Sequence, residues 1–307
     1  MSKIISVVPN ISEGLDQQFI SALVEKLKGV KDLLVLDVSC DSVRNRTVFS
    51  FTGPQEAIFA GGLILYRETL KQVDMRKHKG QYPRLGAVDV FPFVPLKDAT
   101  IEETVAMAVE FAQKVAAEFN LPVYLFSEAA RFPMRRYIEN IREGEYEGLE
   151  QKLKDPRWKP DFGPDTFNPA SGATIIGARH PLLSFTAFLD TGDITVARGL
   201  SEIIKHANGG LSHVNAYAGM DSENNLAEIT VTNSNYRAMP MYRVLEMLRS
   251  EARRYGATVR KVEMIGLIPE NVFIESALYY MGIQEFSFDK ILERKIQTHL
   301  DETKQSN

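Results

Sequence analysis

The chain has 307 residues, of which 44% are hydrophobic and 25% are charged, and its formal net charge is −4. This length favours two domains, and the composition is that of an ordinary globular protein with ample material for a core. A net negative charge disfavours general attraction to nucleic acid or to a membrane surface, because both need a basic excess.

A single cysteine, Cys40, excludes an internal disulfide and fits a reducing compartment. No stretch of the sequence approaches the roughly 18–20 apolar residues of a membrane span. The first ten residues do not resemble a signal peptide, since they lack a small-residue cleavage site. We therefore expect a cytoplasmic protein without nucleic-acid or membrane partners.

Apolar periodicity predicts alternating strands and helices through the first half of the chain. Strands are expected at 3–9, 33–38, 47–52, 87–94 and 122–126, and helices at 16–27, 55–72, 101–119, 134–142 and 146–154. Thr100 and Glu103 form a capping-box pattern that supports the helix from residue 101. We expect Arg135 and Arg136 to cap a helix or face solvent, and the acidic cluster at 143–150 to be a solvated helix start.

A cationic loop precedes the strand at 87–94. In MRKHKGQYPRLGAVDVFPFVP (75–95), the basic residues are Arg76, Lys77, Lys79 and Arg84, next to His78. The segment has no acid before Asp89, and its glycines and prolines predict an irregular backbone. In an acidic protein, a cationic loop at the mouth of a buried strand predicts an anion-binding site.

The segment 155–171 is rich in proline and has no sustained period, so we expect either a linker or a binding loop. Asp161 and Asp165 fit turn-forming positions there. After it, strands at 182–189, 213–219, 227–232 and 259–265 and helices at 194–206 and 241–255 follow the order β-α-β-β-α-β. This is the order of a ferredoxin-like (split βαβ) unit.

The first half can be read in the same order. The predicted class is therefore α+β, with two ferredoxin-like lobes whose mixed or antiparallel sheets are covered by helices. We expect domains at 1–179 and 180–295, followed by a polar tail at 296–307.

Several longer motifs carry a resemblance to a known family. They are VPNISEG (8–14), NRTVFSFTG (45–53), DMRKHKGQYPRLGAVDVFPFVP (74–95), VYLFSEAA (123–130), IREGEYEGL (141–149), PDFGPDTFNPASGATIIGAR (160–179), SEARRYG (250–256) and EMIGLIP (263–269). Together they resemble the formiminotransferase domain of glutamate formimidoyltransferases, the folate enzymes of histidine degradation. The resemblance runs from residue 2 to about residue 285 and covers both lobes, and the family fold is two ferredoxin-like lobes.

The resemblance implies transfer of a formimino group from N-formimino-L-glutamate to N5 of tetrahydrofolate. A related formyl transfer between 5-formyltetrahydrofolate and glutamate would be compatible with such a site. Tetrahydrofolate would be a co-substrate, no metal would be needed, and the partners would be a small-molecule folate and a glutamate derivative. Family members are typically homodimers, so we expect a homodimer.

Folate binding in the family maps to one loop of this sequence. Its residues are Gly163, Pro164, Asp165, Thr166, Phe167, Asn168, Pro169, Ala170, Ser171 and Gly172. Glycines permit a close backbone approach, and we expect Phe167 to pack against the pterin or the benzoyl ring. Both substrates carry carboxylates, and the candidate anion-binding residues are Arg84, Lys79 and Arg179.

The expected catalytic position departs from the family pattern. The family's catalytic base is the third histidine of His-His-Gly-Glu-His-Pro-Arg, and this chain has HKGQYPR at 78–84, which puts Tyr82 there. A phenol has a pKa of about 10, so only ~0.1% is ionised at pH 7. Losing a general base typically costs about 10²–10⁴-fold in rate. His78 is the nearby replacement base, and we take Tyr82 and His78 as the candidate catalytic residues.

Two strands of the second lobe also depart from the family pattern. The usual Phe-Asn-Ile-Asn-Leu is FTAFL at 185–189, and the usual Gln-Val-Ser begins with Glu228. Three interpretations stay open: a folate-dependent transferase, a folate-binding protein with little catalysis, and a transferase with a changed substrate. Turnover separates the first two, and loss of folate binding would favour the third.

Overall fold

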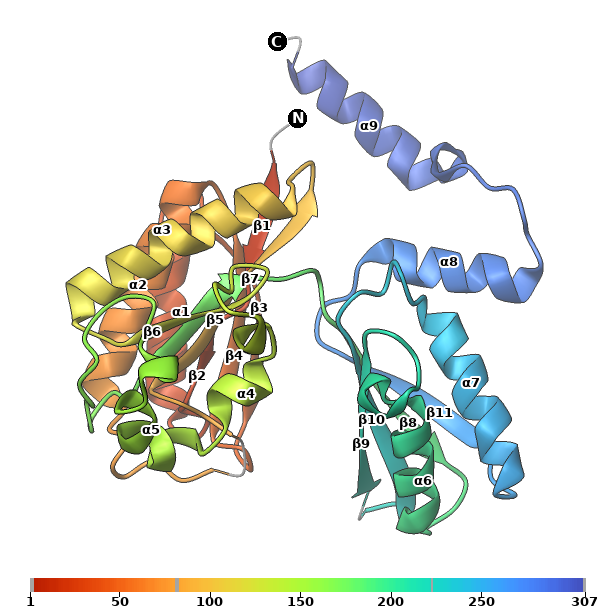
Figure 1. The fold of residues 1–307 in the computed structure, drawn as a ribbon. Coiled ribbons are helices and arrows are strands. Elements are labelled where there is room, and N and C mark those ends of the chain that lie inside the picture. Colours follow the sequence, from red (N-terminus) through yellow and green to blue (C-terminus); the bar gives the residue numbers. More distant parts are fainter. Residues whose placement is uncertain (1–2, 81–82, 222, 306–307) are drawn as a thin grey trace. The chain divides into compact units, whose positions relative to one another are not determined.

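The computed structural model describes residues 3–80, 83–221 and 223–305, with side chains up to residue 300. The chain forms two compact units, Met1–Pro181 and Leu182–Asn307 (Figure 1). Each is an α+β unit with a helix-covered sheet, and the strand order of each contains the ferredoxin-like arrangement, so the predicted fold class is confirmed.

The sheet of the first unit is mixed. Its strands are β1 (Ile4–Val7), β2 (Asn10–Ile11), β3 (Leu34–Asp41), β4 (Arg46–Thr52), β5 (Val88–Lys97), β6 (Val123–Ser127) and β7 (Thr174–Ala178). Strands β1 and β2 both pair with β4 and β5, so they are two halves of one strand interrupted at Pro9. The order β3-β4-β1/β2-β5 is ferredoxin-like and antiparallel, and β7 and β6 extend it in parallel.

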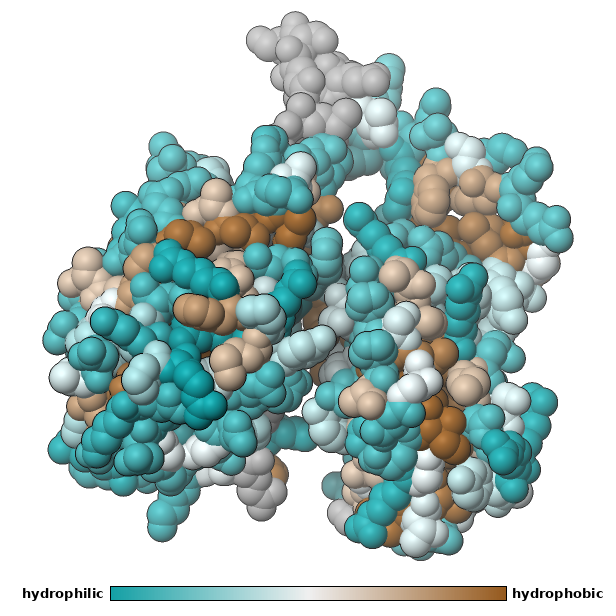
Figure 2. Space-filling view, in the orientation of Figure 1, coloured by the Kyte–Doolittle hydropathy of each residue, from teal (hydrophilic) through white to brown (hydrophobic). Residues whose placement is uncertain are grey.

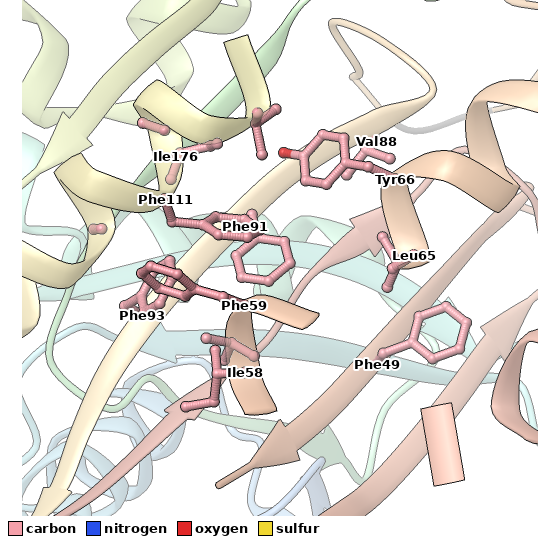
Figure 3. Packing of buried hydrophobic residues seen from close by; sticks show 14 of the residues in the cluster. Phe49, Ile58, Phe59, Leu65, Tyr66, Val88, Phe91, Phe93, Phe111 and Ile176 are labelled. Atoms are coloured by element: carbon pink, nitrogen blue, oxygen red, sulfur yellow. The ribbon is translucent and has the colours of Figure 1, made fainter. Parts of the chain in front are cut away.

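Three helices, α1 (Gln17–Lys28), α2 (Gln55–Gln72) and α3 (Ile101–Phe119), bury their apolar faces against one side of this sheet. Aromatic rings dominate that core, with Phe91 and Phe111 4.6 Å apart between centroids and Tyr66 stacked on Phe91 (Figure 3). The Tyr66 hydroxyl lies 2.7 Å from the Thr174 hydroxyl of β7, which satisfies both polar groups in the core. The predicted capping box of Thr100 and Glu103 is present at the start of α3.

The other side of the sheet is covered by shorter elements and by the 155–173 loop. These elements are η1 (Pro133–Arg136), α4 (Ile138–Arg142), α5 (Glu145–Leu153) and η2 (Pro156–Trp158), and their core contains Leu85, Val90, Tyr124, Trp158 and Ile175. The predicted single helix at 134–142 is wrong: a 3₁₀ turn and α4 replace it, with Tyr137 extended between them.

Arg135 explains the break. Its guanidinium is not solvated as expected but only 1% exposed, 2.8 Å from the Asp161 carboxylate. It also donates to the carbonyls of Arg157 and Lys159. Asp161, expected to form a turn, accepts in addition the N–H of Leu125. A buried guanidinium requires acceptors on several sides, and here the 155–161 segment supplies them.

The second unit is an antiparallel sheet with the order β11-β8-β10-β9. Its elements are β8 (Leu183–Leu189), α6 (Ile194–Ile204), β9 (Val214–Asp221), β10 (Leu226–Asn233), α7 (Met241–Arg254) and β11 (Val259–Ile265). Phe185, Ala187 and Leu189 of β8 join the core with α6 and α7. Alternation therefore places Thr186 and Phe188 on the opposite face, where the Thr186 hydroxyl meets that of Thr230.

Two further helices were not predicted, α8 (Glu270–Met281) and α9 (Leu292–Gln305). The expected polar tail at 296–307 thus overlaps a helix, which the four-residue spacing of Leu292, Ile296 and Leu300 could have indicated. Figure 2 shows apolar side chains gathered over α8, and the exposed fractions of Phe273 and Met281 are 52% and 64%. Within the described residues, no helix has the length and apolarity to cross a membrane.

We predict that Gly163→Ala destabilises the chain far more than Gly144→Ala. Both glycines have φ of +80°, so an added side chain meets similar backbone strain at both. A Cβ at Gly163 would lie 1.9 Å from the Leu121 carbonyl oxygen, whereas at Gly144 the nearest atom would be 3.6 Å away. Urea unfolding should show an extra loss of about 2 kcal/mol or more for Gly163→Ala. Equal losses would mean that the loop moves freely away from β6.

Candidate functional site

The predicted cationic loop and the predicted folate loop lie side by side at the start of β5. Backbone N–H groups of Met75 and Ala87 donate to the carbonyls of Ala170 and Ser171, at 2.8 and 2.9 Å. An isolated bridge pairs Gly86 with Gly172. Two segments that are some ninety residues apart in sequence therefore form one local structure, and the first unit brings most of the candidate residues together.

Two glycines of the predicted folate loop, Gly163 and Gly172, lie against the backbone of the same chain. Gly172 has φ of +70°, and a Cβ there would lie 2.3 Å from the Leu85 carbonyl oxygen. Gly163 makes the even closer approach to Leu121. Both positions need glycine because the loop touches the backbone of its own protein, so their lack of a side chain is explained without a ligand.

The middle of the folate loop is anchored by aromatic contacts. Phe167 is half-buried, with its ring centroid 5.6 Å from that of Tyr146, and it packs against the core that contains Trp158. The Tyr146 hydroxyl donates to the Pro169 carbonyl at 2.6 Å. Asp165 and Thr166 are exposed, so among the predicted folate residues these two present free side chains.

Asn45 connects three loops. It is buried, in the left-handed region with φ of +47°, which asparagine tolerates better than most residues. Its side chain accepts the N–H of Gly14 and donates to the Lys79 carbonyl, both at 2.9 Å. Only an amide supplies a donor and an acceptor at once in this geometry. Asn45 thus fixes the VPNISEG loop and the cationic loop relative to β4.

His78 is half-buried and has both ring nitrogens in contacts. Its Nε2 lies 3.0 Å from the Asn45 carbonyl oxygen, and its Nδ1 accepts from Arg84 Nε at 3.3 Å. A carbonyl only accepts and a guanidinium only donates, so the ring is neutral with its proton on Nε2. Burial, and to a lesser extent the charge of Arg84, hold the pKa of His78 below its usual value.

Arg84 is 7% exposed and bound to carboxylates of this same chain. Its two terminal nitrogens contact Glu147 bidentately at 2.7 and 2.8 Å, and Nη1 also contacts Glu145 at 3.0 Å. Burial alone would lower the pKa of Arg84, but the two glutamates outweigh it and raise that pKa. The 143–150 cluster is a helix start with largely exposed carboxylates, as predicted, but two of these carboxylates also bind Arg84. The Glu-x-Glu pattern at 145–147 was the sequence signal that could have indicated an arginine partner for this cluster.

The two other predicted anion-binding residues have no such partner. Lys79 is exposed, and Arg179, which follows β7, donates from Nη1 to the His180 carbonyl at 3.0 Å. Burial lowers the pKa of Arg179 to about 10. Among the described residues, neither side chain forms an ion pair with a carboxylate. The backbone N–H of Arg179 donates to the Phe93 carbonyl, so Arg179 lies farther along β5 than the loop that contains Lys79. The predicted catalytic residue Tyr82 lies outside the described residues.

A small hollow lies at this site, and a larger one lies in the second unit. The small one, of about 10 Å³, is lined by Ile11, Ser12, Arg44, Asn45, Arg46, His78, Arg84 and Asp89. It has room for about one water molecule. The larger one, of about 490 Å³, is lined by Phe188, Met220, Asp221, Glu223, Asn224, Glu228, Lys261 and Glu263. It contains two of the positions that depart from the family pattern, Phe188 and Glu228. Within the described ranges, no group of three or more His, Cys, Asp or Glu side chains could hold a metal ion.

We predict that Glu147→Gln lowers the free energy of unfolding by about 1–2 kcal/mol, because the buried Arg84 loses its bidentate partner. Glu150→Gln is the matched control on the same helix, since its pair with Lys154 is about 60% exposed on both sides. That control should change stability by less than about 0.5 kcal/mol. Equal effects in urea unfolding would contradict a structural role for the Arg84 pair.

Comparison with known proteins places both units in one family. Residues 4–179 match the model of the N-terminal subdomain of the formiminotransferase domain, and residues 195–302 match that of the formiminotransferase domain. A glutamate formimidoyltransferase from Streptococcus pyogenes serotype M1 is 36% identical over 96% of this chain and 99% of its own length. One from Thermoplasma acidophilum is 37% identical, over 96% and 97%.

A rat formimidoyltransferase-cyclodeaminase is 38% identical over 91% of this chain, which spans about half (53%) of that longer protein. The matches extend over both units and include the loops that meet at the start of β5. This chain therefore belongs to the formiminotransferase family of transferase enzymes.

Proposed function

We propose that this chain transfers the formimino group of N-formimino-L-glutamate to N5 of tetrahydrofolate. The observation that carries the proposal is its similarity, over 96% of the chain, to two proteins named glutamate formimidoyltransferase. Tetrahydrofolate is then a co-substrate, and no metal is required. Formyl transfer between 5-formyltetrahydrofolate and glutamate would use the same two classes of ligand, a folate and a glutamate derivative, and is the second candidate.

The reaction needs two proton transfers. N5 attacks the amidine carbon and loses its proton, and the bond from that carbon to the glutamate nitrogen breaks as this nitrogen gains a proton. We assign Tyr82 to the site of these transfers because it occupies the family's catalytic histidine position. Its phenol can donate a hydrogen bond, but with a usual pKa of about 10 it is a weak base at neutral pH. His78, the second candidate, has no free lone pair while Arg84 contacts it.

Folate is assigned to the 163–172 loop. Asp165 and Thr166 expose polar side chains there, and the partly exposed ring of Phe167 lies beside Tyr146. Such a mixture of aromatic and polar groups suits a flat, polar ring system. Docking of this loop against the loop of Tyr82 supports a common site, because transfer requires N5 and the amidine carbon to be adjacent.

The substrate carboxylates are assigned to Lys79 and Arg179. Both cations are without a carboxylate partner among the described residues, whereas Arg84 is occupied by Glu147. A further part of the proposal is that the chain works as a cytoplasmic homodimer, as is typical of the family. Light scattering during gel filtration would test the dimer.

We predict that the unmodified chain transfers the formimino group slowly. The Tyr82→His variant should be at least about 10²-fold faster, because an imidazole titrates near neutrality and can act as the base. The assay measures 5-formiminotetrahydrofolate formation at saturating substrates, with tetrahydrofolate affinity measured in parallel. Equal rates would mean that Tyr82 does not limit proton transfer. Absence of turnover in both with folate still bound would favour a binding protein, and absence of binding would favour a changed substrate.

We predict that Lys79→Gln raises the KM for formiminoglutamate by about fivefold, the effect of losing one exposed charge contact of about 1 kcal/mol. Lys77→Gln is the control, because it removes the same charge from the same loop. The charge of Lys77 acts on Asp74, whose pKa is about 2, mainly because it is hydrogen-bonded to Arg76. The control should change KM by less than twofold. Similar effects of both variants would indicate general attraction rather than a bound carboxylate at Lys79.

A further inference from the structure

We propose that Arg84 is a positioning residue: it locks His78 in the neutral Nε2–H form and ties together the two ends of the loop that carries Tyr82. In this role Arg84 does not bind substrate, and His78 does not exchange protons with it. The catalytic consequence rests on the proposed function, whereas the protonation state of His78 does not.

The first step of the argument is loop closure. His78 and Arg84 are the first and last residues of the 78–84 segment, and their side chains meet at 3.3 Å. Each end is also held by the framework. The backbone N–H of His78 donates to the Asp74 carbonyl, and the Leu85 N–H donates to the buried Asp89 carboxylate. Residues 78 and 84 are thus two fixed ends joined through their side chains.

The second step concerns the proton on His78. Protonation would place an N–H on Nδ1, where it would oppose the N–H of Arg84, and the contact would break. The charged groups acting on the ring are Arg84, which disfavours the proton, and Glu13 and Glu147, which favour it. Arg44, Arg46 and Asp89 line the adjoining hollow. Burial adds to the effect of Arg84, so the neutral ring is the stable form in the closed loop.

The third step is that Arg84 is itself held from the opposite side. Glu145 and Glu147 lie in the first turn of α5 and clamp its terminal nitrogens, leaving Nε directed at His78. Tyr146, between them, donates to Pro169 of the predicted folate loop. One helical turn therefore positions both the loop of Tyr82 and the loop assigned to folate, and Arg84 is the connection to the former.

The preference of the folded chain for a neutral His78 ring makes folding stability depend on pH. Because the pKa of His78 in the folded chain is below its usual 6.5, the contribution is present above pH 6.5 and is lost as the pH falls through the folded value. The contact between Arg84 Nε and His78 Nδ1 should accordingly be lost under acidic conditions.

The direct test is ¹⁵N-histidine NMR of the full chain from pH 5 to 9, with His78→Gln used to assign the His78 signals among the five histidines. We expect a protonated Nε2 and a bare Nδ1 at pH 7. In Arg84→Gln the two tautomers should mix and the midpoint should rise towards 6.5. If Arg84→Gln does not fold, Glu147→Gln replaces it, because this variant weakens the hold on Arg84 without removing the guanidinium. Its tautomer ratio and titration midpoint for His78 should lie between those of the unmodified chain and those of a free histidine. An unchanged tautomer and midpoint in both folded variants would overturn the proposal.

Steady-state transfer provides the second readout. A positioning role predicts that Arg84→Gln lowers kcat by at least tenfold with KM changed less than threefold, whereas loss of a substrate contact would raise KM. The glutamine in His78→Gln keeps a hydrogen-bond donor and an acceptor but cannot titrate. The kcat of this variant should fall by no more than about tenfold. A loss above about 10²-fold would make His78 a proton-transfer group and contradict the proposal. If neither the variants nor the unmodified chain transfers the formimino group, the proposed function fails. The NMR result would still decide whether Arg84 sets the tautomer of His78.

Discussion

A buried guanidinium is the constraint on which this site depends. Arg84 cannot lose its charge, so it must be matched by acceptors wherever the fold buries it. Glu145 and Glu147 supply them from α5, which fixes that helix over the start of β5. Arg135 is also buried, and its guanidinium is matched by the Asp161 carboxylate. This pairing fixes the path of the 155–161 segment. These two arginines hold the irregular elements that cover this side of the sheet, together with the buried Arg142 of α4, which pairs with Asp89 of β5.

The irregular segments are also held by backbone contact. Gly163 and Gly172 let the predicted folate loop approach the residues before β6 and β5 more closely than any side chain would allow. Strand β7, which follows the loop, then enters the sheet in parallel between β5 and β6. A parallel neighbour cannot be reached by a tight hairpin, so a long connection is required, and here that connection carries candidate binding residues. Topology therefore explains why a loop of this length is part of a compact unit.

The second unit offers a separate chemical environment. On the face of its sheet away from α6 and α7, the ammonium of Lys261 lies 4.5 Å from the Phe188 ring centroid, and Glu228 occupies the neighbouring strand. Lys261 also pairs with Glu263 at 2.6 Å. Because Asp221, Glu223 and Glu228 line the same hollow, its net charge is negative. Phe188 and Glu228, two of the positions expected to depart from the family pattern, thus line one hollow together with Lys261.

The sequence by itself determined the α+β class and most of the helices and strands, because apolar periodicity and caps such as Thr100–Glu103 are local properties. It did not predict β7, which lies between β5 and β6, or the helices α8 and α9. Its long motifs also indicated the family. Only the tertiary structure decided the roles of individual charges. Arg84 was expected to meet a ligand and instead meets Glu147, 63 residues away. Asn45 joins loops from three motifs, and α9 forms where a polar tail was expected. The partner of a charge or an amide depends on which segments the packing brings together, and no local pattern records that.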